Sequence, residues 1–221
     1  MQFVRCRVSL PDGVAIKPEA HAPAAITSRV WRRALAEVRG AMDDISYDHI
    51  AAIAALLPGD ETHLPGVRVL FESGNLVFLP YIAEDACSNV IVERSLPLAG
   101  CLHLPEAHCR LLMMECPGPF TFSGGDHAVL DADSVRGGLT VRAWEPGDRF
   151  RPLGAPGRRK LQDIFVDAGV PRRWRKRIPV ITDADGIIWV AGFRLADRVK
   201  ITATTTRCVQ LTIEWEFNPW I

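Results

Sequence analysis

The segment that most constrains the fold reads Val141-Arg142-Ala143-Trp144-Glu145-Pro146-Gly147-Asp148-Arg149-Phe150-Arg151-Pro152-Leu153-Gly154. It continues with Gly157-Arg158-Arg159-Lys160-Leu161 and then with Pro171-Arg172-Arg173-Trp174-Arg175-Lys176-Arg177-Ile178-Pro179. A Gly-Asp-Arg turn, a basic helix start and a second group of arginines therefore belong to one continuous unit, residues 139–200. We expect such a basic surface to bind a polyanion.

The charge of this segment is hidden in the whole chain, where 26 basic residues balance 26 acidic ones. Residues 136–177 contain 12 basic and four acidic residues, so this segment carries a net charge of +8 and the remainder carries −8. A field that is positive on one segment steers an anionic partner to one face of the molecule. Nucleic acid is the partner that this pattern favours.

Two groups of cations are the candidate RNA contacts. Arginine binds phosphate oxygens through two parallel hydrogen bonds, and a helix start also favours an anion. We expect Trp174 to anchor the second group in the core and Asp148 to stabilise its own turn. A solvated charged face remains the alternative for both groups. The predicted phosphate-contacting residues are Arg149, Arg158, Arg159, Lys160, Arg172, Arg173, Arg175, Lys176 and Arg177.

Length and composition indicate an ordinary globular protein. The chain has 221 residues, of which 48% are hydrophobic and 24% charged, enough for one large domain or two small ones. The longest apolar run near the N-terminus, residues 50–57, is far shorter than the roughly 20 residues of a membrane span. Residues 1–7 lack the features of a signal peptide. We therefore expect a cytoplasmic protein without a membrane partner.

Cysteine usage does not indicate a disulfide framework or a metal site. The six cysteines are irregularly spaced and include no Cys-x-x-Cys pair, so we expect reduced thiols. Residues 101–116 contain zinc-ligand types without the close spacing of a zinc knuckle. Asp131 and Asp133 near His127 read as loop residues with no organised catalytic partner. The sequence predicts no metal, no bound cofactor and no catalytic residue in this chain.

The first 82 residues predict a small helical domain with a β-hairpin. Apolar residues recur at helical spacing in residues 24–38, and Ser46 precedes a second helix that ends near Pro58-Gly59. The apolar runs 67–71 and 76–79 flank Ser73-Gly74-Asn75, which is typical of a hairpin. We place one domain at residues 1–82 and a second at 83–221.

The second domain is predicted to combine short strands with one helix, which makes the chain α+β. Leu161, Ile164, Phe165 and Ala168 form a helical stripe that Gly169 closes. Asp183-Ala184-Asp185-Gly186 joins two apolar runs as a hairpin, and alternation from Val209 to Phe217 predicts a strand with one buried face. The other predicted strands are residues 89–93, 111–115, 128–130 and 139–143.

With these residues in view, the chain resembles the C-terminal two-thirds of a bacterial tRNA(Ile)-lysidine synthetase over roughly residues 24–211. The residues that carry the resemblance are Trp31-Arg32-Arg33, Leu64-Pro65-Gly66, Val141-Arg142, Pro146-Gly147-Asp148-Arg149-Phe150, Lys160-Leu161 to Phe165, Arg177-Ile178-Pro179-Val180 and Ile188-Trp189-Val190-Ala191-Gly192-Phe193-Arg194. The resemblance implies a helical substrate-recognition domain followed by an α/β C-terminal domain. A relative of that C-terminal domain occurs in the β subunit of phenylalanyl-tRNA synthetase.

The resemblance also implies an activity. Members of this family ligate lysine to the wobble cytidine of an isoleucine tRNA and use ATP to adenylate the base. Their N-terminal ATP-pyrophosphatase domain carries a Ser-Gly-Gly-x-Asp-Ser loop, whose backbone amides hold phosphate. The implied partners are therefore the isoleucine tRNA and that N-terminal domain, and ATP and lysine are substrates of the complete enzyme.

This sequence does not contain the family's Ser-Gly-Gly-x-Asp-Ser loop. Ser123-Gly124-Gly125-Asp126-His127 lacks one intervening residue and the final serine, and the residues after it predict a strand instead of a helix. We expect the chain to be a fragment without the catalytic domain, or a degenerate paralogue, and to be inactive alone. A protein-interaction module, a homodimer and an enzyme of another class remain open alternatives.

Overall fold

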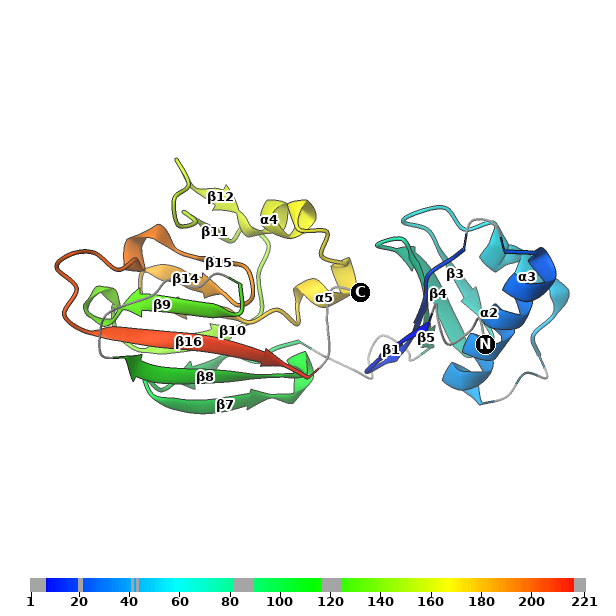
Figure 1. The fold of residues 1–221 in the computed structure, drawn as a ribbon, viewed down its shortest axis with the longest axis horizontal. Helices are drawn as coiled ribbons and strands as arrows, with labels where there is room; N and C mark the ends of the chain where they lie inside the picture. The colour runs from blue at the N-terminus through cyan, green and yellow to red at the C-terminus, as the bar shows by residue number, and fades with distance from the viewer. Residues whose placement is uncertain are drawn as a thin grey trace. The chain divides into compact units, whose positions relative to one another are not determined.

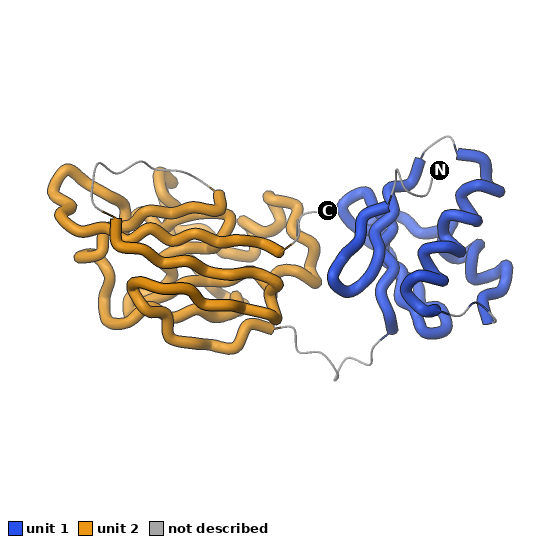
Figure 2. Tube along the Cα trace, turned by 60° about the horizontal axis from the view of Figure 1, so that its bottom comes forward, with its two compact units in different colours: residues 1–87, 221 blue, residues 88–220 orange. Residues whose placement is uncertain are grey.

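The computed structural model describes residues 7–19, 22–40, 42, 44–81, 90–116 and 125–216. The chain divides into two compact units, which are residues 1–87 with residue 221 and residues 88–220 (Figure 2). The predicted boundary between residues 82 and 83 lies outside the described residues and stays a prediction. No helix of the described residues is long and apolar enough to cross a membrane.

Unit 1 is a five-stranded antiparallel sheet with two helices against one face (Figure 1). The strand order is β1-β2-β5-β4-β3. The elements are β1 (Arg7–Leu10), β2 (Gly13–Ile16), α2 (Ala24–Arg39), α3 (Tyr47–Ala54), β3 (Glu61–Leu64), β4 (Val67–Glu72) and β5 (Asn75–Pro80). The α+β class is confirmed, but the region holds more strand than we predicted. Strands β1, β2 and β3 were missed because four residues are too few for a clear two-residue period.

The predicted helices of unit 1 form for local reasons. Trp31, Ala34 and Leu35 lie at positions i, i+3 and i+4 of α2, and all three are buried against the sheet. The backbone N–H of His49 donates a hydrogen bond to the side-chain oxygen of Ser46. In return, the backbone N–H of Ser46 donates one to a ring nitrogen of His49. This reciprocal pair satisfies two donors at the start of α3 and confirms the predicted cap.

The predicted hairpin of unit 1 is confirmed. Strands β4 and β5 pair in antiparallel fashion from Val67 to Glu72, and the two turn residues Ser73 and Gly74 have φ values of 50° and 77°. Two successive positive φ values are the signature of the tight turn whose twist matches that of the flanking strands. The turn therefore sets the register that buries Val69 and Phe78 on the helix side.

Unit 2 contains two larger antiparallel sheets that share one hydrophobic core. One has the order β15-β14-β13-β10-β6 and the other β7-β8-β16-β9 (Figure 1). Leu111 and Leu211 from the second sheet belong to the same buried cluster as Val141 and Ile188 from the first. The strands are β6 (Arg94–Leu96), β7 (Gly100–Leu104), β8 (Cys109–Cys116), β9 (His127–Asp131), β10 (Leu139–Arg142), β11 (Arg149–Phe150), β12 (Arg159–Lys160), β13 (Val180–Asp183), β14 (Gly186–Val190), β15 (Arg194–Leu195) and β16 (Cys208–Trp215).

The helices of unit 2 are short and lie outside these two sheets. Helix α4 (Leu161–Asp167) buries Leu161, Ile164 and Phe165, and Gly169 follows it with a φ of 68°, as the sequence predicted. Ala168, the fourth residue of the predicted stripe, lies just after the helix and is exposed. Helix α5 (Arg172–Arg175) follows one short turn later. The described residues also include the 3₁₀ helices Pro105–Ala107, Ala132–Ser134 and Asp197–Val199.

Most predicted strands of unit 2 are confirmed. Strand β16 alternates as expected, since Val209, Leu211 and Ile213 are buried and Glu214 is exposed. The hairpin of β13 and β14 turns at residues 183–186. The strand predicted at residues 89–93 is wrong for residues 90–93, which form no strand, and residue 89 lies outside the described residues. Strand β6 begins at Arg94.

Two cysteines of unit 2 depart from the expectation of reduced thiols. Cys116 and Cys208 are directly opposite each other on β8 and β16, with their Cα atoms 5.6 Å apart, and they form a disulfide. They are 92 residues apart in the chain, so spacing alone could not reveal the pair. Of the other described cysteines, Cys101 is exposed and Cys109 is buried. Burial, with Glu216 and Glu106 nearby, raises the pKa of the Cys109 thiol to about 12, so this thiol stays protonated.

Candidate nucleic-acid interface

The first group of predicted RNA contacts gathers on the hairpin formed by β11 and β12. Arg149 pairs with Lys160 across the two strands, and Phe150 pairs with Arg159. The guanidinium of Arg158 donates a hydrogen bond to the backbone oxygen of Arg149 at 3.1 Å. All four cations are exposed, and we call them the hairpin cations: Arg149, Arg158, Arg159 and Lys160.

The pairing of the hairpin cations brings like charges together. Residues directly opposite on neighbouring strands project their side chains to the same face, so Arg149 and Lys160 share one face of the hairpin. Like charges in this position destabilise a strand pair unless an anion lies between them. Arg159 is different, because its guanidinium forms an exposed ion pair with Asp167 at 2.6 Å. Arg149 and Lys160, in contrast, form no ion pair within the described residues, so they are the stronger candidates for contact with an anion.

The Gly-Asp-Arg turn before the hairpin is held by a nearly buried ion pair. Arg142 donates two hydrogen bonds to the carboxylate of Asp148, at 2.9 and 2.8 Å, and the backbone N–H of Glu145 donates a third at 2.8 Å. The side chain of Arg142 is 19% exposed and that of Asp148 is 12% exposed. Burial alone would raise the pKa of Asp148, but the hydrogen bonds from Arg142 and Glu145 outweigh it and lower that pKa. Asp148 therefore stabilises the turn, as we expected.

Arg158, Arg159 and Lys160 lie immediately before helix α4, whose N-cap residue is Lys160, so the helix start predicted from the sequence is confirmed. Arg159 and Lys160 also belong to strand β12, and helix α4 begins at Leu161. The backbone N–H of Leu161 donates to the backbone oxygen of Asp148 at 2.9 Å, which holds the end of β12 against the turn. Strand pairing therefore places Arg149 next to Lys160 at the N-terminus of α4.

The second group lies on and next to helix α5. Arg172 and Lys176 are exposed, whereas Arg173 and Arg175 are half-buried. The Nε of Arg175 donates to the backbone oxygen of Val170 at 3.2 Å. Burial, together with the neighbouring charge of Arg172, lowers the pKa of Arg175. We call these four residues the α5 cations: Arg172, Arg173, Arg175 and Lys176.

Arg177, the ninth predicted contact, is buried. Its side chain is 9% exposed, and its guanidinium carbon lies 4.5 Å from the ring centre of Trp174. Arg173 lies over the same ring at 5.1 Å, and Trp174 itself is 1% exposed, so the expected core position of Trp174 is confirmed. Cation–π contacts of this kind stabilise a charge away from water. The guanidinium of Arg177 therefore packs against the ring of Trp174 in α5 and has little surface left for contact with a partner.

Asp131 and Asp133, which the sequence predicted to be loop residues, lie at the end of β9 and in the 3₁₀ helix Ala132–Ser134, where both are structural. Asp131 accepts hydrogen bonds from the backbone of Asp133 at 2.9 Å and from the hydroxyl of Thr205 at 3.0 Å. Asp133 accepts one from Thr206 at 3.0 Å. These bonds fix the segment that leads into β16. Within the described residues, no group of three or more His, Cys, Asp or Glu side chains is placed to hold a metal ion.

The superficial phosphate-loop pattern falls only partly on described residues. Residues 123 and 124 lie outside them, while Gly125 and Asp126 form a turn that leads directly into strand β9. The carboxylate of Asp126 accepts a hydrogen bond from the indole of Trp215 at 3.2 Å. A strand follows this turn, as predicted, so no helix N-terminus is present there to hold phosphate.

A pocket of about 190 Å³ lies in unit 2 and was not predicted from the sequence. Its walls come from the start of β9, from the end of β14, from β15 and from the loop after β11. The signal that could have found it is the aromatic and basic composition of residues 189–194. The lining residues are Gly125, His127, Ala128, Leu153, Trp189, Phe193, Arg194 and Leu195.

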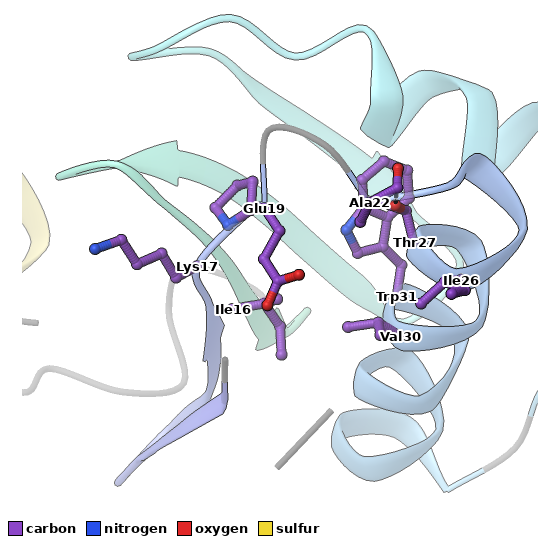
Figure 3. Close-up of a pocket in the computed structure, with 9 residues that line it drawn as sticks. Ile16, Lys17, Glu19, Ala22, Ile26, Thr27, Val30 and Trp31 are labelled. Atoms are coloured by element: carbon purple, nitrogen blue, oxygen red, sulfur yellow. Dashed lines mark hydrogen bonds between the residues drawn. The ribbon is translucent and has the colours of Figure 1, made fainter. Parts of the chain in front are cut away.

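A second hollow, in unit 1, is too small for a ligand. It lies between the end of β2 and the first turns of α2, where Ile16 and Glu19 face Trp31 and Val30 (Figure 3). The side chain of Lys17 points away from it (Figure 3). Its volume is about 20 Å³, which is room for about one water molecule.

Comparison with known proteins links unit 2 to one family. The family model described as the TilS substrate C-terminal domain matches residues 139–215. The tRNA(Ile)-lysidine synthase of Geobacter sulfurreducens is 31% identical over 186 residues, which are 82% of this chain and 39% of that protein. Curated relatives such as this one match most of the chain, but the chain spans only about two fifths of their length.

Solved structures are similar as well. The crystal structure of a TilS C-terminal domain aligns with 57% of this chain and 98% of its own length, at 31% identity and a TM-score of 0.53. An N-terminal fragment of the phenylalanyl-tRNA synthetase β-subunit from Pyrococcus horikoshii aligns with 41% of this chain and 28% of its own length, at 17% identity and a TM-score of 0.35.

Proposed function

We propose that this chain, which belongs to the tRNA(Ile)-lysidine synthase family, is the tRNA-recognition part of such an enzyme. In this proposal the complete enzyme is a cytoplasmic ligase that joins lysine to the wobble cytidine of isoleucine tRNA and consumes ATP. The ligation chemistry belongs to an ATP-pyrophosphatase domain outside residues 1–221. This chain supplies no catalytic residue, cofactor site or metal site, and holds the tRNA.

The observation that carries the proposal is the exposure of cations on one positively charged segment. Six of the nine predicted contacts are exposed, four on the hairpin and two on α5, within a segment of net charge +8. Helix α4 joins the hairpin to α5 in the chain (Figure 1). A folded RNA presents a continuous run of phosphates, which a surface of this kind can follow.

Phosphate contacts would supply affinity and position, and the shape of the RNA would supply discrimination. Arg149 and Lys160 would share a phosphate, because they project from the same face of the hairpin. Arg172 and Lys176 would contact a second part of the backbone. Arg177 would act only through Trp174, by keeping α5 in place.

The proposal is tested by the salt dependence of tRNA binding. Each phosphate contact should contribute about 0.7 to 0.9 to the slope of log affinity against log salt concentration. Replacing Arg149 and Lys160 by Gln should reduce the slope by about one to two such units, and replacing Arg172 and Lys176 should do the same. Fluorescence anisotropy with isoleucine tRNA, from 50 to 300 mM salt in steps of about 50 mM, provides the measurement.

Two exposed arginines elsewhere in unit 2 provide the matched control. Arg110 pairs with Glu214 at 3.1 Å and Arg207 with Glu115 at 3.3 Å. Replacing both by Gln removes the same number of positive charges and should leave the slope unchanged. An equal loss of slope in this control would mean that charge number matters and the proposed surface does not.

Two further measurements separate this proposal from its alternatives. The isolated chain should not consume ATP in the presence of tRNA and lysine, and turnover would indicate an enzyme of another class. A protein-interaction or dimerisation module would show association that depends on protein concentration, without binding tRNA. Sedimentation of the chain with and without tRNA distinguishes these outcomes.

A further inference from the structure

The pocket of unit 2 combines aromatic walls with a cation at its mouth. Trp189, at the end of β14, and Phe193 line it, and Arg194 follows directly on β15. Gly192 has a φ of 79°, a left-handed conformation that turns the chain between the two strands. One short segment therefore supplies two aromatic side chains and one guanidinium to the same hollow.

The aromatic walls are held in place from behind. Trp189 is 1% exposed, and the ring of Phe193 meets the ring of Phe165 edge to face at a centroid distance of 5.6 Å. Leu153 and Leu195 complete the apolar lining, and the backbone N–H of Leu153 donates to the oxygen of Leu195 at 2.8 Å. The pocket is therefore built on strands and on a bonded loop, which favours a fixed shape.

Polar groups lie at the edge of the pocket. Arg194 is exposed, and its guanidinium donates a hydrogen bond to the backbone oxygen of Phe193 at 3.4 Å; within the described residues no carboxylate forms an ion pair with it. One ring nitrogen of His127 lies 3.0 Å from the hydroxyl of Thr212, which orients the ring and leaves its other nitrogen for a partner. The pocket mouth is therefore suited to an anion next to a planar ring.

The volume limits the size of the occupant. The volume of about 190 Å³ is below the roughly 300–1,000 Å³ of pockets for drug-sized ligands. A single ring system fits this range and a whole dinucleotide does not. An aromatic base stacks on aromatic side chains irrespective of its sequence.

We propose that this pocket receives the base of one unpaired nucleotide of an RNA, with the partly exposed ring of Phe193 packing on the base, the buried Trp189 forming the floor, and Arg194 binding the adjoining phosphate. The inference rests on the proposed function, because it assumes that unit 2 binds RNA. The hairpin strand β11 leads directly to the pocket wall, since Leu153 is only four positions after Arg149 in the chain. That distance is at most about 14 Å in an extended chain, so one RNA can contact both places.

The test compares three RNA hairpins that have the same stem. One ends bluntly, one carries an unpaired 3′ extension of a few nucleotides, and one carries the same extension without bases. The 221-residue chain should bind the extended hairpin ~5- to 150-fold more tightly than the abasic one, which is the range for stacking of one base. Fluorescence anisotropy at one fixed salt concentration measures all three affinities.

Two variants locate the effect. Leu153→Trp fills the pocket and should bind the extended hairpin only as tightly as the abasic one, while its affinities for the abasic and blunt hairpins stay those of the unaltered chain. Arg194→Gln removes the cation and should weaken binding of both extended hairpins while leaving the blunt hairpin unaffected. Arg110→Gln is the matched control and should change nothing. Blunt-hairpin affinity and circular dichroism report whether each variant is folded.

The outcomes separate this inference from the proposed function. Salt-dependent binding of all three hairpins with equal affinity would overturn the pocket assignment and leave the proposed function standing. Retention of the preference for bases in a folded Leu153→Trp variant would also overturn it, because the base would then lie elsewhere. Absence of any salt-dependent RNA binding would overturn the proposed function and this inference together.

Discussion

At the scale of single residues, the same residue type serves opposite purposes in this chain. Arg149 and Lys160 face solvent and each other, whereas Arg142 is mostly buried and committed to Asp148. Arg177 lies under the ring of Trp174. A sequence shows that a residue is basic, but burial and partners decide whether its charge can serve a ligand.

The Arg142–Asp148 pair makes a prediction about acid sensitivity. Replacing Asp148 by Asn leaves the guanidinium of Arg142 without its carboxylate and should lower the free energy of unfolding by roughly 1.5–3 kcal/mol at pH 7. Because the folded pKa of Asp148 is lowered, its contribution is complete above the ordinary aspartate pKa and is lost as pH falls through the folded pKa. Urea unfolding at pH 7 and at acidic pH measures both effects.

The variant should therefore be less stable than the unaltered chain at neutral pH and should lose less stability on acidification. Asp185→Asn, at an exposed turn position, is the control and should follow the unaltered chain. Parallel acid profiles for the unaltered chain and Asp148→Asn would contradict the assigned role of this pair.

At the scale of elements, local chemistry accounts for the helices and the hairpins. The capping pair of Ser46 and His49 starts α3, and two positive φ values close the hairpin of β4 and β5. These signals lie within a few residues of one another, so they could be predicted before any tertiary structure was known. Four-residue strands such as β1 and β2 carry no comparable signal, because their place depends on the partner strand β5.

The cap of α3 makes a prediction at this scale. Ser46→Ala removes the oxygen that accepts from the N–H of His49 and should cost about 1 kcal/mol of stability in unit 1. Ser46→Asp keeps an acceptor and should cost little or nothing. Hydrogen exchange at the first amides of α3 should accelerate only in the alanine variant. Equal exchange in both variants would show that the cap is not what starts the helix.

At the scale of the whole molecule, each unit has a core of its own. The main clusters of unit 1 and unit 2 share no residue, and their strands belong to separate sheets. A defect in the core of one unit should therefore leave the other folded.

Gly13 offers a test of that independence. A Cβ atom at Gly13 would lie 2.1 Å from the backbone oxygen of Phe78, and neither backbone can move without disturbing the pairing of β2 and β5. Gly13→Ala should destabilise unit 1 by about 1–3 kcal/mol or more and leave the hydrogen exchange of β16 unchanged. Gly138→Ala has open space around its Cβ and is the control. Faster exchange in β16 of Gly13→Ala would contradict independent units.

The sequence by itself determined the helix stripes, the hairpin turns, the alternation of β16 and the gathering of positive charge between residues 136 and 177. Each of these depends on neighbours in the chain, whose spacing is set by covalent geometry and backbone hydrogen bonding. Only the tertiary structure decided which cations remain exposed, that Cys116 faces Cys208, and that residues 125–195 enclose a pocket. These depend on which distant strands pair, and that choice follows from burying one shared core and not from any local pattern.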